Sequence, residues 1–508
     1  MDRRSFLKEA AVASGAFALM DGRPTQAAPA VGKSRIRTKT PFVGVQIASH
    51  SFFDEGIDHC LDLLQESGGV NVLLISSHSY YGAMGRPRHL MADHGVPIRD
   101  NAKRKLPRVW LKHHDKYYRD TTLRHKKPDP DAEHAGREVF AELAEPARKR
   151  GMLLYERMYE PSSSAKRFVE NFETILSIDV YGQRRRRPCM NNPNYRAWLF
   201  GTLRDMFENY PVDGIQYGAE RCGPMSDLVF WDDVPGCFCE HCTKLGRERG
   251  IDVARAKEGF TEFHKYFVSL QKGEANPTDG AFIGLIRIVM EYPELLAWEQ
   301  QWCDTAMDLH SKVREVVRSV NPNAEVGRHV DHRQSTWDVL FRAGSSYNEM
   351  ADGCDFIKPI LYHDIAGPRV FKNLERTNGT ILRQLSLKQQ LGLYYALFNH
   401  DPTKEPTLEE LPTEGLSPEY VYTETKRAVD GAAGKARVYS GIGLDIPSGK
   451  GWGTDKWQSD PEEVYTAVAS AFQAGGAGVV ASREYEEITV SSLKAMKRAV
   501  QDAAKAKG

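Results

Sequence analysis

The sequence predicts an α/β protein of the (β/α)8 class, a TIM barrel with long insertions in its βα loops. Eight short runs rich in β-branched and other apolar residues follow one another, and amphipathic segments separate them. Continuous apolar strands alternating with helices indicate a parallel sheet covered on both faces, and eight such units fit a closed barrel. No GxGxxG or Walker motif follows the first run, which disfavours an open doubly wound sheet.

The strands and helices of the repeat are recognised by their periodicity. Leu199, Leu203 and Met206 share one face of a 3.6-residue helical pattern between two apolar runs. Similar patterns separate the other runs. The eight predicted strands are Phe42–Ala48, Val70–Ser76, Met152–Met158, Val212–Tyr217, Ala324–Val330, Phe356–Tyr362, Arg437–Leu444 and Gly478–Ser482.

Residues 31–508 are expected to form one catalytic barrel domain. Two long excursions, at about 77–151 and 221–301, interrupt the βα repeat. Both excursions follow predicted strands. They are therefore insertions at the C-terminal ends of the strands, where barrel enzymes build their active sites.

Residues 1–30 have the features of an export signal. "DRRSFLK", from Asp2 to Lys8, resembles the twin-arginine signal, and a mostly apolar run from Ala10 to Met20 follows it. Small residues at 28–30 suit a signal peptidase. The apolar run is shorter than the roughly 20 residues that span a bilayer, so no membrane anchor is expected. We expect the twin-arginine export machinery to deliver the protein to a bacterial periplasm or to the medium.

The charge balance argues against a polyanionic partner. Lysines and arginines number 68, as do aspartates and glutamates, so the chain carries no net charge. Without a net positive field, nucleic acid is not an expected partner. No organic cofactor is expected, and oligomeric state is not indicated.

Three of the eight cysteines, Cys237, Cys239 and Cys242, lie within the stretch "GCFCEHC". Cysteines two residues apart on extended backbone share a face but bridge poorly, so these thiols need other partners or a shared metal. Four thiolates around zinc at about 2.3 Å require a ligand from another segment, and Cys222 is expected to complete this structural site. Two disulfides are the main alternative in an exported protein, and redox chemistry is a third. Substitutes for the fourth ligand are Cys189, His241 or an aspartate.

The segment from Cys189 to Cys222 resembles the third-helix to fourth-strand unit of barrel glycoside hydrolases. In those proteins an Asn-Pro-x-x-Arg-like helix start leads into Val-Asp-Gly-Ile, matched here by "NNPNYRAW" and "VDGI", and a carboxylate ends the strand. The resemblance places that carboxylate at Glu220, preceded by Ala219 where many barrel glycosidases have Asn. The cysteine stretch is similar to the zinc-binding cluster of one β-galactosidase family. Residues 475–500 resemble the final strand and helix of exported glycosidases.

The chemistry of glycosidic cleavage independently supports a role for Glu220. A carboxylate that follows an apolar barrel strand projects into the mouth, where burial can raise its pKa enough for it to donate a proton. Cleavage also needs a second carboxylate, which attacks the anomeric carbon or activates water. Asp445 is the expected partner by analogy, because it ends the seventh strand, where many barrel glycosidases keep their nucleophile. Other candidates at strand ends are Asp364, Asp331 and Glu484.

The remaining predicted strand ends are rich in side chains that suit sugars. A polyhydroxylated ligand needs many directional hydrogen bonds together with one flat apolar contact. Trp452, in a glycine-rich loop, could supply that contact by stacking on a pyranose. The expected substrate-binding residues are His50, His78, Tyr81, Glu156, Arg157, His329, Lys358, Tyr362, His363, Asp364, Trp452 and Glu484.

These observations predict an exported glycoside hydrolase that acts on oligo- or polysaccharides by a two-carboxylate acid/base mechanism. Two alternatives stay open. The strand-end histidines His50, His78, His329 and His363 could hold a catalytic metal, as in barrel hydrolases or sugar isomerases, although the first strand lacks a His-x-His pair. The chain could also be a carbohydrate-binding barrel without catalytic activity.

Overall fold

The computed structural model describes residues 41–79, 92–97, 99, 104–218, 220–446 and 458–506. These residues belong to one unit that extends from Ser34 to Gly508. The predicted leader, residues 1–30, and the candidate residues Tyr81 and Trp452 lie outside the described residues. Of the helices described, none combines the length and the apolar character needed to cross a membrane.

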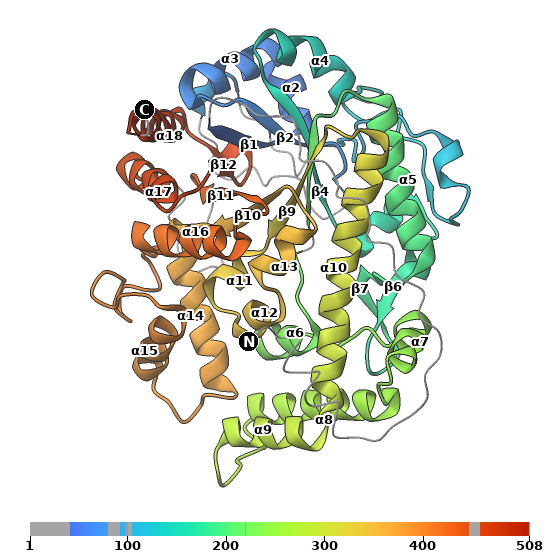
Figure 1. Cartoon of the computed structure of the whole chain (residues 1–508), viewed down its shortest axis with the longest axis vertical. Helices are drawn as coiled ribbons and strands as arrows, with labels where there is room; N and C mark the ends of the chain where they lie inside the picture. Colours follow the sequence, from blue (N-terminus) through green and yellow to red (C-terminus); the bar gives the residue numbers. More distant parts are fainter. Residues whose placement is uncertain are drawn as a thin grey trace. The chain divides into compact units, whose positions relative to one another are not determined.

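Eight parallel strands close into a barrel, which confirms the predicted (β/α)8 fold. The strands follow chain order around the ring, and the first and last strands pair to close it (Figure 1). Helical connections that each return the chain to the next position in the sheet produce this order. The barrel strands are β1 (Phe42–Ala48), β2 (Val72–Ser76), β4 (Leu153–Tyr159), β8 (Gly214–Gly218), β9 (Glu325–Val330), β10 (Phe356–Leu361), β11 (Arg437–Gly443) and β12 (Gly478–Ser482).

The strands agree with the predicted apolar runs to within a few residues, and a side-chain bond precedes two of the strands that start later than predicted. The Asn71 amide accepts a bond from the Val43 backbone at 2.9 Å, just before β2 begins. The Asp213 carboxylate accepts one from the Leu154 backbone at 2.9 Å, just before β8. These side-chain bonds add to backbone bonds at the same positions, from Asn71 to the Val43 carbonyl at 3.0 Å and from Asp213 to the Leu154 carbonyl at 2.8 Å.

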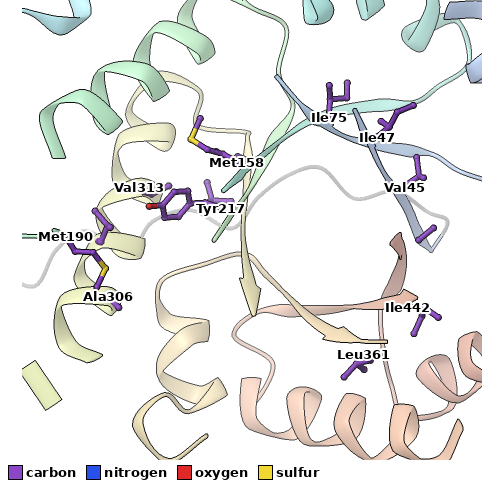
Figure 2. Close-up of a cluster of buried hydrophobic side chains, with 14 of the residues drawn as sticks. Val45, Ile47, Ile75, Met158, Met190, Tyr217, Ala306, Val313, Leu361 and Ile442 are labelled. Carbon is purple, nitrogen blue, oxygen red and sulfur yellow. The ribbon is translucent and has the colours of Figure 1, made fainter. Parts of the chain in front are cut away.

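Alternate residues of each strand face the barrel axis or the surrounding helices. Phe42, Tyr155, Phe356 and Tyr439 pack together inside the barrel near the start of the strands, and the rings of Phe42 and Tyr439 stack with centroids 3.9 Å apart. Outward-facing apolar residues form a second layer beneath the helices, and Figure 2 shows part of it, with Val45 on β1. The aromatic cluster fills the bottom of the barrel, so polar side chains gather toward the opposite end.

In the described part of the chain, one long helix after each strand covers the outside of the barrel, with one shorter exception. Several begin at a polar residue whose side chain accepts backbone N–H bonds, such as Asn192, Asp460 and Thr489. These helices are α3 (Ile57–Gly68), α4 (Val139–Lys149), α5 (Pro193–Asn209), α10 (Glu294–Val320), the short α13 (Tyr347–Asp352), α16 (Pro418–Ala432), α17 (Pro461–Gln473) and α18 (Val490–Lys505).

Additional elements extend the loops that follow the strands. Two small antiparallel sheets pair β3 (Arg124–His125) with β5 (Val169–Glu170), and β6 (Leu176–Ile178) with β7 (Arg184–Pro188). The sequence did not indicate the insertion after β4, which carries β5 to β7, or the helices α14 and α15 after β10. The added helices are α2 (Ser49–Glu55), α6 (Pro224–Trp231), α7 (Glu240–Glu248), α8 (Val253–Gln271), α9 (Ala281–Glu291), α11 (His332–Thr336), α12 (Val339–Gly344), α14 (His363–Gly379) and α15 (Leu387–Phe398). Short 3₁₀ turns are η1 (Ala92–His94), η3 (Asp115–Tyr118), η4 (Ser163–Arg167), η5 (Phe172–Ile175) and η6 (Tyr485–Glu487).

Candidate active site at the barrel mouth

A cavity of about 880 Å³ opens at the C-terminal ends of the strands. Pockets for small ligands occupy roughly 300–1,000 Å³, so this cavity has room for a saccharide. Among the described residues, each barrel strand except β11 contributes a lining residue at or just after its C-terminal end. These residues are Ala48, Ser76, Arg157, Tyr159, Glu220, Asp331, Ile360, Tyr362 and Glu484.

Glu220 follows β8 and faces the cavity, with its side chain 27% exposed. Its Oε1 lies 3.6 Å from Nε2 of the buried His329 on β9. On the other edge of the imidazole, Gln216 Nε2 lies 3.3 Å from His329 Nδ1. An amide nitrogen only donates, so Nδ1 accepts and the proton of the neutral ring is on Nε2, facing Glu220.

We expect the His329 ring to stay neutral well below neutral pH. Burial, followed by the positive charge of Lys358, lowers the pKa of His329 to about 4. In an NMR titration from about pH 8 to about pH 5, the ring nitrogens should keep the Nε2-protonated pattern of a neutral histidine. The His329→Gln variant assigns the signal. A midpoint near the ordinary histidine value of about 6.5 would contradict this account of the ring.

Glu484 follows β12, and Arg157 of β4 holds its carboxylate. The guanidinium donates from Nη1 and Nη2 to the two carboxylate oxygens at 2.9 and 2.7 Å, and such bidentate pairing fixes the carboxylate orientation. Arg157 Cζ lies 4.9 Å from the centre of the Tyr159 ring, which meets His329 edge-on at 4.9 Å. A continuous path of contacts therefore joins Glu484 to Glu220 across the mouth.

Glu220 and Glu484 act electrostatically on the same two neighbouring groups, Tyr159 and Lys358. Burial raises the pKa of Tyr159 to about 12, and the charges of Glu220 and Glu484 contribute to this rise, whereas Arg157 opposes it. The same two carboxylates partly offset the lowering of the Lys358 pKa by burial and by Arg157. Both carboxylates therefore influence the Tyr159 hydroxyl and the Lys358 amine.

Asp445, the expected second carboxylate, does not line the cavity. Its Oδ1 accepts a bond from the Ser459 backbone at 2.8 Å, and its Oδ2 accepts bonds from the Thr489 backbone and hydroxyl at 2.7 and 2.9 Å. The side chain is buried, and a positive φ of 52° turns the chain after β11. The structure corrects this prediction, because Asp445 ties the end of β11 to the start of α18.

Replacing Asp445 should therefore affect stability rather than turnover. The Asp445→Asn variant keeps one acceptor oxygen but puts an amide nitrogen opposite a backbone donor. We expect the free energy of unfolding to fall by about 1–3 kcal/mol. Urea unfolding measures this loss. A large loss of activity in a variant that folds normally would return Asp445 to the catalytic candidates.

The other predicted substrate-binding residues divide by position. His78, Arg157, Tyr362 and Glu484 line the cavity. His329 and Lys358 lie beneath its floor on β9 and β10, where both are buried.

Four predicted substrate-binding residues instead support the fold, and none of them lines the cavity. His50 Nε2 lies 3.1 Å from Glu486 Oε2. Glu156 Oε2 accepts a bond from the Ser77 backbone at 3.3 Å. His363 is buried at the first position of α14, and Asp364 accepts a bond from the Ser459 hydroxyl at 2.9 Å. Position at a strand end did not distinguish these side chains from those that reach the cavity.

The strand-end histidines do not form a metal site. Among the described residues, the group of His, Cys, Asp or Glu side chains close enough to hold a metal contains only cysteines. His78 instead contacts Ser77 Oγ at 2.9 Å and His113 Nε2 at 3.3 Å. His50 and His329 contact different carboxylates, as described above.

Sequence reasoning missed several arginine and aromatic side chains of the cavity. Tyr159 could have been found, because it lies two residues after Arg157 on one strand and so shares its face. Arg369 and Trp231 belong to helices of the insertions, where no spacing points to the cavity. The missed residues include Tyr159, Arg221, Trp231, Trp302, Arg333, Arg369 and Arg483.

The cysteine cluster contains Cys189 in place of the predicted Cys222. The four thiol sulfurs lie within 4.8 Å of one another, with Cys189 Sγ 3.5 Å from Cys242 Sγ and 3.4 Å from Cys239 Sγ. The Ile178 backbone N–H and the Asn191 amide donate to two of the sulfurs. A cluster of this composition could bind a metal ion. Its four members are Cys189, Cys237, Cys239 and Cys242.

Cys222 has a different environment. Its thiol is buried, donates to Asp227 Oδ1 at 3.1 Å and accepts from Arg333 Nη1 at 3.2 Å. Cys189 joins the cluster instead because β7 ends at Pro188 and delivers the next residue to it. The predicted fourth member of the cluster, Cys222, is therefore replaced by Cys189, which was one of the stated substitutes.

The cysteine cluster is connected to the backbone at Glu220. Two residues before Cys189, Arg187 Nη2 donates to the Glu220 carbonyl at 3.4 Å. Arg221 donates to the Pro188 carbonyl at 2.9 Å and to the buried Glu160 at 2.8 Å. The loop that bears Cys189 therefore helps to position the backbone around Glu220.

No family model matches the sequence, and no curated protein matches it. The solved structures that match the chain include the following three. The β-galactosidase from the psychrophilic Marinomonas ef1 has 11% identity and a TM-score of 0.48, with 92% of this chain and 59% of that chain covered. The PgaB (BpsB) glycoside hydrolase domain from Bordetella bronchiseptica has 12% identity and a TM-score of 0.47, with 87% of this chain and 94% of that chain covered. α-L-fucosidase isoenzyme 2 from Paenibacillus thiaminolyticus has 11% identity and a TM-score of 0.45, with 92% of this chain and 50% of that chain covered. The chain spans about half the length of the fucosidase.

Proposed function

We propose that the chain is an exported glycoside hydrolase that cleaves oligo- or polysaccharides at the barrel mouth. Glu220 is the proton donor, and Glu484 is the second carboxylate. The observation that carries the proposal is the path of contacts from Glu220 through His329, Tyr159 and Arg157 to Glu484. Glu220 and Glu484, at the two ends of the path, both line a cavity large enough for a saccharide.

The proposed reaction uses the different environments of the two carboxylates. Glu220 gives its proton to the glycosidic oxygen as the bond to the anomeric carbon breaks. Glu484 meets the positive charge that develops on the sugar, while Arg157 keeps its oxygens in place. Water then completes hydrolysis and returns a proton to Glu220. The Nε2–H edge of His329 faces Glu220, 3.6 Å from its Oε1.

A panel of aryl glycosides and oligosaccharides tests the proposed function. The purified protein should release sugar from at least one member without added divalent metal. Saturable binding of saccharides with no product from any member would favour the carbohydrate-binding alternative and contradict the proposal. Activity that appears only after a divalent ion is added would favour the metal-dependent alternative.

We further propose that the cysteine cluster holds a structural zinc ion. In a tetrahedral site with Zn–S distances of about 2.3 Å, neighbouring sulfurs are about 3.8 Å apart. The separations of 3.4 and 3.5 Å are close to this value and exceed the about 2.05 Å of a disulfide. Cys189, Cys237, Cys239 and Cys242 would supply all four ligands, which leaves no position for substrate. Zinc here would join the insertion after β4 to the insertion after β8.

A further inference from the structure

The floor beneath the two carboxylates contains a buried lysine. Along β10, Phe356 joins the aromatic cluster inside the barrel, and Ile360 lines the cavity, so Lys358 between them also faces the barrel axis. Lys358 is fully buried. Within the described part of the chain, its Nζ has no hydrogen-bond partner. A buried ammonium is costly unless a negative charge balances it, so the protonation state of Lys358 depends on the charges around it.

The neighbouring strand leaves room for this side chain. A Cβ atom at Gly441 of β11 would lie 2.6 Å from Lys358 Nζ and 2.2 Å from its Cε. Glycine at this position therefore allows the lysine to extend along the inside of the barrel.

Other polar atoms of the interior are also unpaired within the described residues. They include both amide atoms of the fully buried Gln46 and the Nε of Arg157.

Two basic side chains lie near one aromatic side chain of the cavity, Tyr362. Lys358 Nζ lies 5.6 Å, and Arg369 Cζ 5.7 Å, from the centre of the Tyr362 ring. Tyr362, Arg369 and Arg483 line the cavity. Burial lowers the pKa of Arg369, and the positive charge of Arg483 lowers it further. We call Lys358, Tyr362 and Arg369 the cationic corner.

We propose that the cationic corner binds an anionic substituent of the saccharide, a carboxylate or a sulfate ester. The inference rests on the proposed function, because it names the substrate class of the same site. An anion in the cavity beside Tyr362 would bring a negative charge close to the Lys358 ammonium beneath it. A hydroxyl group could accept one hydrogen bond but would not balance the buried charge. Uronic acid units and sulfated sugar units share this chemistry.

The surroundings of Lys358 disfavour its ammonium form. Burial, followed by the positive charge of Arg157, lowers the pKa of the Lys358 amine well below its usual value. The charges of Glu220 and Glu484 only partly offset this effect. An additional negative charge next to Nζ would favour the ammonium form again. Binding at this position should therefore select anions.

Calorimetric titration with three matched disaccharides tests the inference. One carries a hexuronic acid, one a sulfate ester, and one is neutral. The Glu220→Gln chain is used alongside the wild-type chain, so that hydrolysis does not consume the ligand. We expect at least one anionic disaccharide to bind about 10- to 100-fold more tightly than the neutral one, as for a charge-assisted hydrogen bond. The anionic disaccharide that binds more tightly shows whether the site prefers a carboxylate or a sulfate ester.

Two variants assign the preference to Lys358. Lys358→Met keeps the length of the side chain but removes the charge, and it should bind all three disaccharides with similar affinity. Folding should survive, because an apolar side chain replaces an unpaired buried amine. Gly441→Ala retains the lysine but displaces it, and it should reduce the same preference. Lys494→Met, at an exposed position of α18, is the control and should leave the preference unchanged.

The outcomes separate this inference from the proposed function. Equal affinity for anionic and neutral disaccharides, or an anion preference that survives in Lys358→Met, would overturn the cationic corner. Hydrolysis of neutral glycosides combined with equal affinities would sustain the proposed function and reject this inference. Anion preference that depends on Lys358, in a protein that cleaves nothing, would sustain the binding site and reject the glycosidase.

Discussion

The Glu220→Gln variant is expected to lose about 100- to 10,000-fold in turnover of unactivated glycosides, the range for loss of a general acid. Glutamine has the shape of the glutamate side chain but cannot donate an acidic proton to the leaving oxygen. Because the Glu220 side chain is partly exposed at the cavity, the change should leave the fold intact. Initial rates of sugar release at saturating substrate give the effect on kcat, and thermal unfolding shows whether the variant is folded.

Two other carboxylates serve as matched comparisons for Glu220. Glu484→Gln should also reduce kcat strongly, because it removes the charge that meets the developing cation. Asp445→Asn should leave kcat within a few-fold of the wild-type value, since its oxygens bind backbone groups away from the cavity. Wild-type kcat in Glu220→Gln would refute its assignment. A similar loss in all three folded variants would show that the assay reports general damage.

Loss of the cysteine site is expected to produce the largest effect on stability. Cys189→Ser removes one of four thiolate ligands, so the variant should bind zinc much more weakly. The two insertions that the cluster joins would then lose a shared attachment. We expect the free energy of unfolding to fall by on the order of 4 kcal/mol, as for loss of a structural metal. Elemental analysis measures the metal, and urea unfolding measures the stability.

Cys222→Ser is the control for this experiment, because its thiol is buried but lies outside the cluster. It should retain about one zinc per chain. Activity of Cys189→Ser should fall as well, since β7, which leads directly to Cys189, places Arg187 against the Glu220 carbonyl. A wild-type chain without metal and without titratable thiols would show disulfides instead of zinc.

The barrel could be predicted from the sequence because parallel strands buried on both faces are continuous apolar runs. The run from Phe42 to Ala48 and the seven later apolar runs could be recognised as strands from their composition alone. The position of Glu220 followed from the same pattern, since the residue after a barrel strand reaches the mouth. Local periodicity was sufficient for both conclusions.

The errors arose where a local backbone turn or a distant segment decides the position of a side chain. Asp445 ends a strand, as expected, but its φ of 52° accompanies a turn that directs the carboxylate to Thr489. Cys189 reaches the cysteine cluster because the β6–β7 hairpin brings it there, and nothing in the cysteine spacing specifies that hairpin. Arg369 reaches the cavity from a helix that the sequence did not place. Such long-range contacts are absent from the local pattern.

The central claim is that Glu220 delivers a proton to a glycosidic oxygen, and the dependence of its variant on the leaving group tests it most directly. The measurement compares kcat/KM of Glu220→Gln with that of the wild-type chain on two glycosides of one sugar, one with an alkyl and one with a dinitrophenyl leaving group. We predict a loss of about 1,000-fold or more on the alkyl glycoside and less than about tenfold on the dinitrophenyl glycoside, whose leaving group needs no proton. Equal losses on both substrates, or no loss on either, would contradict the account.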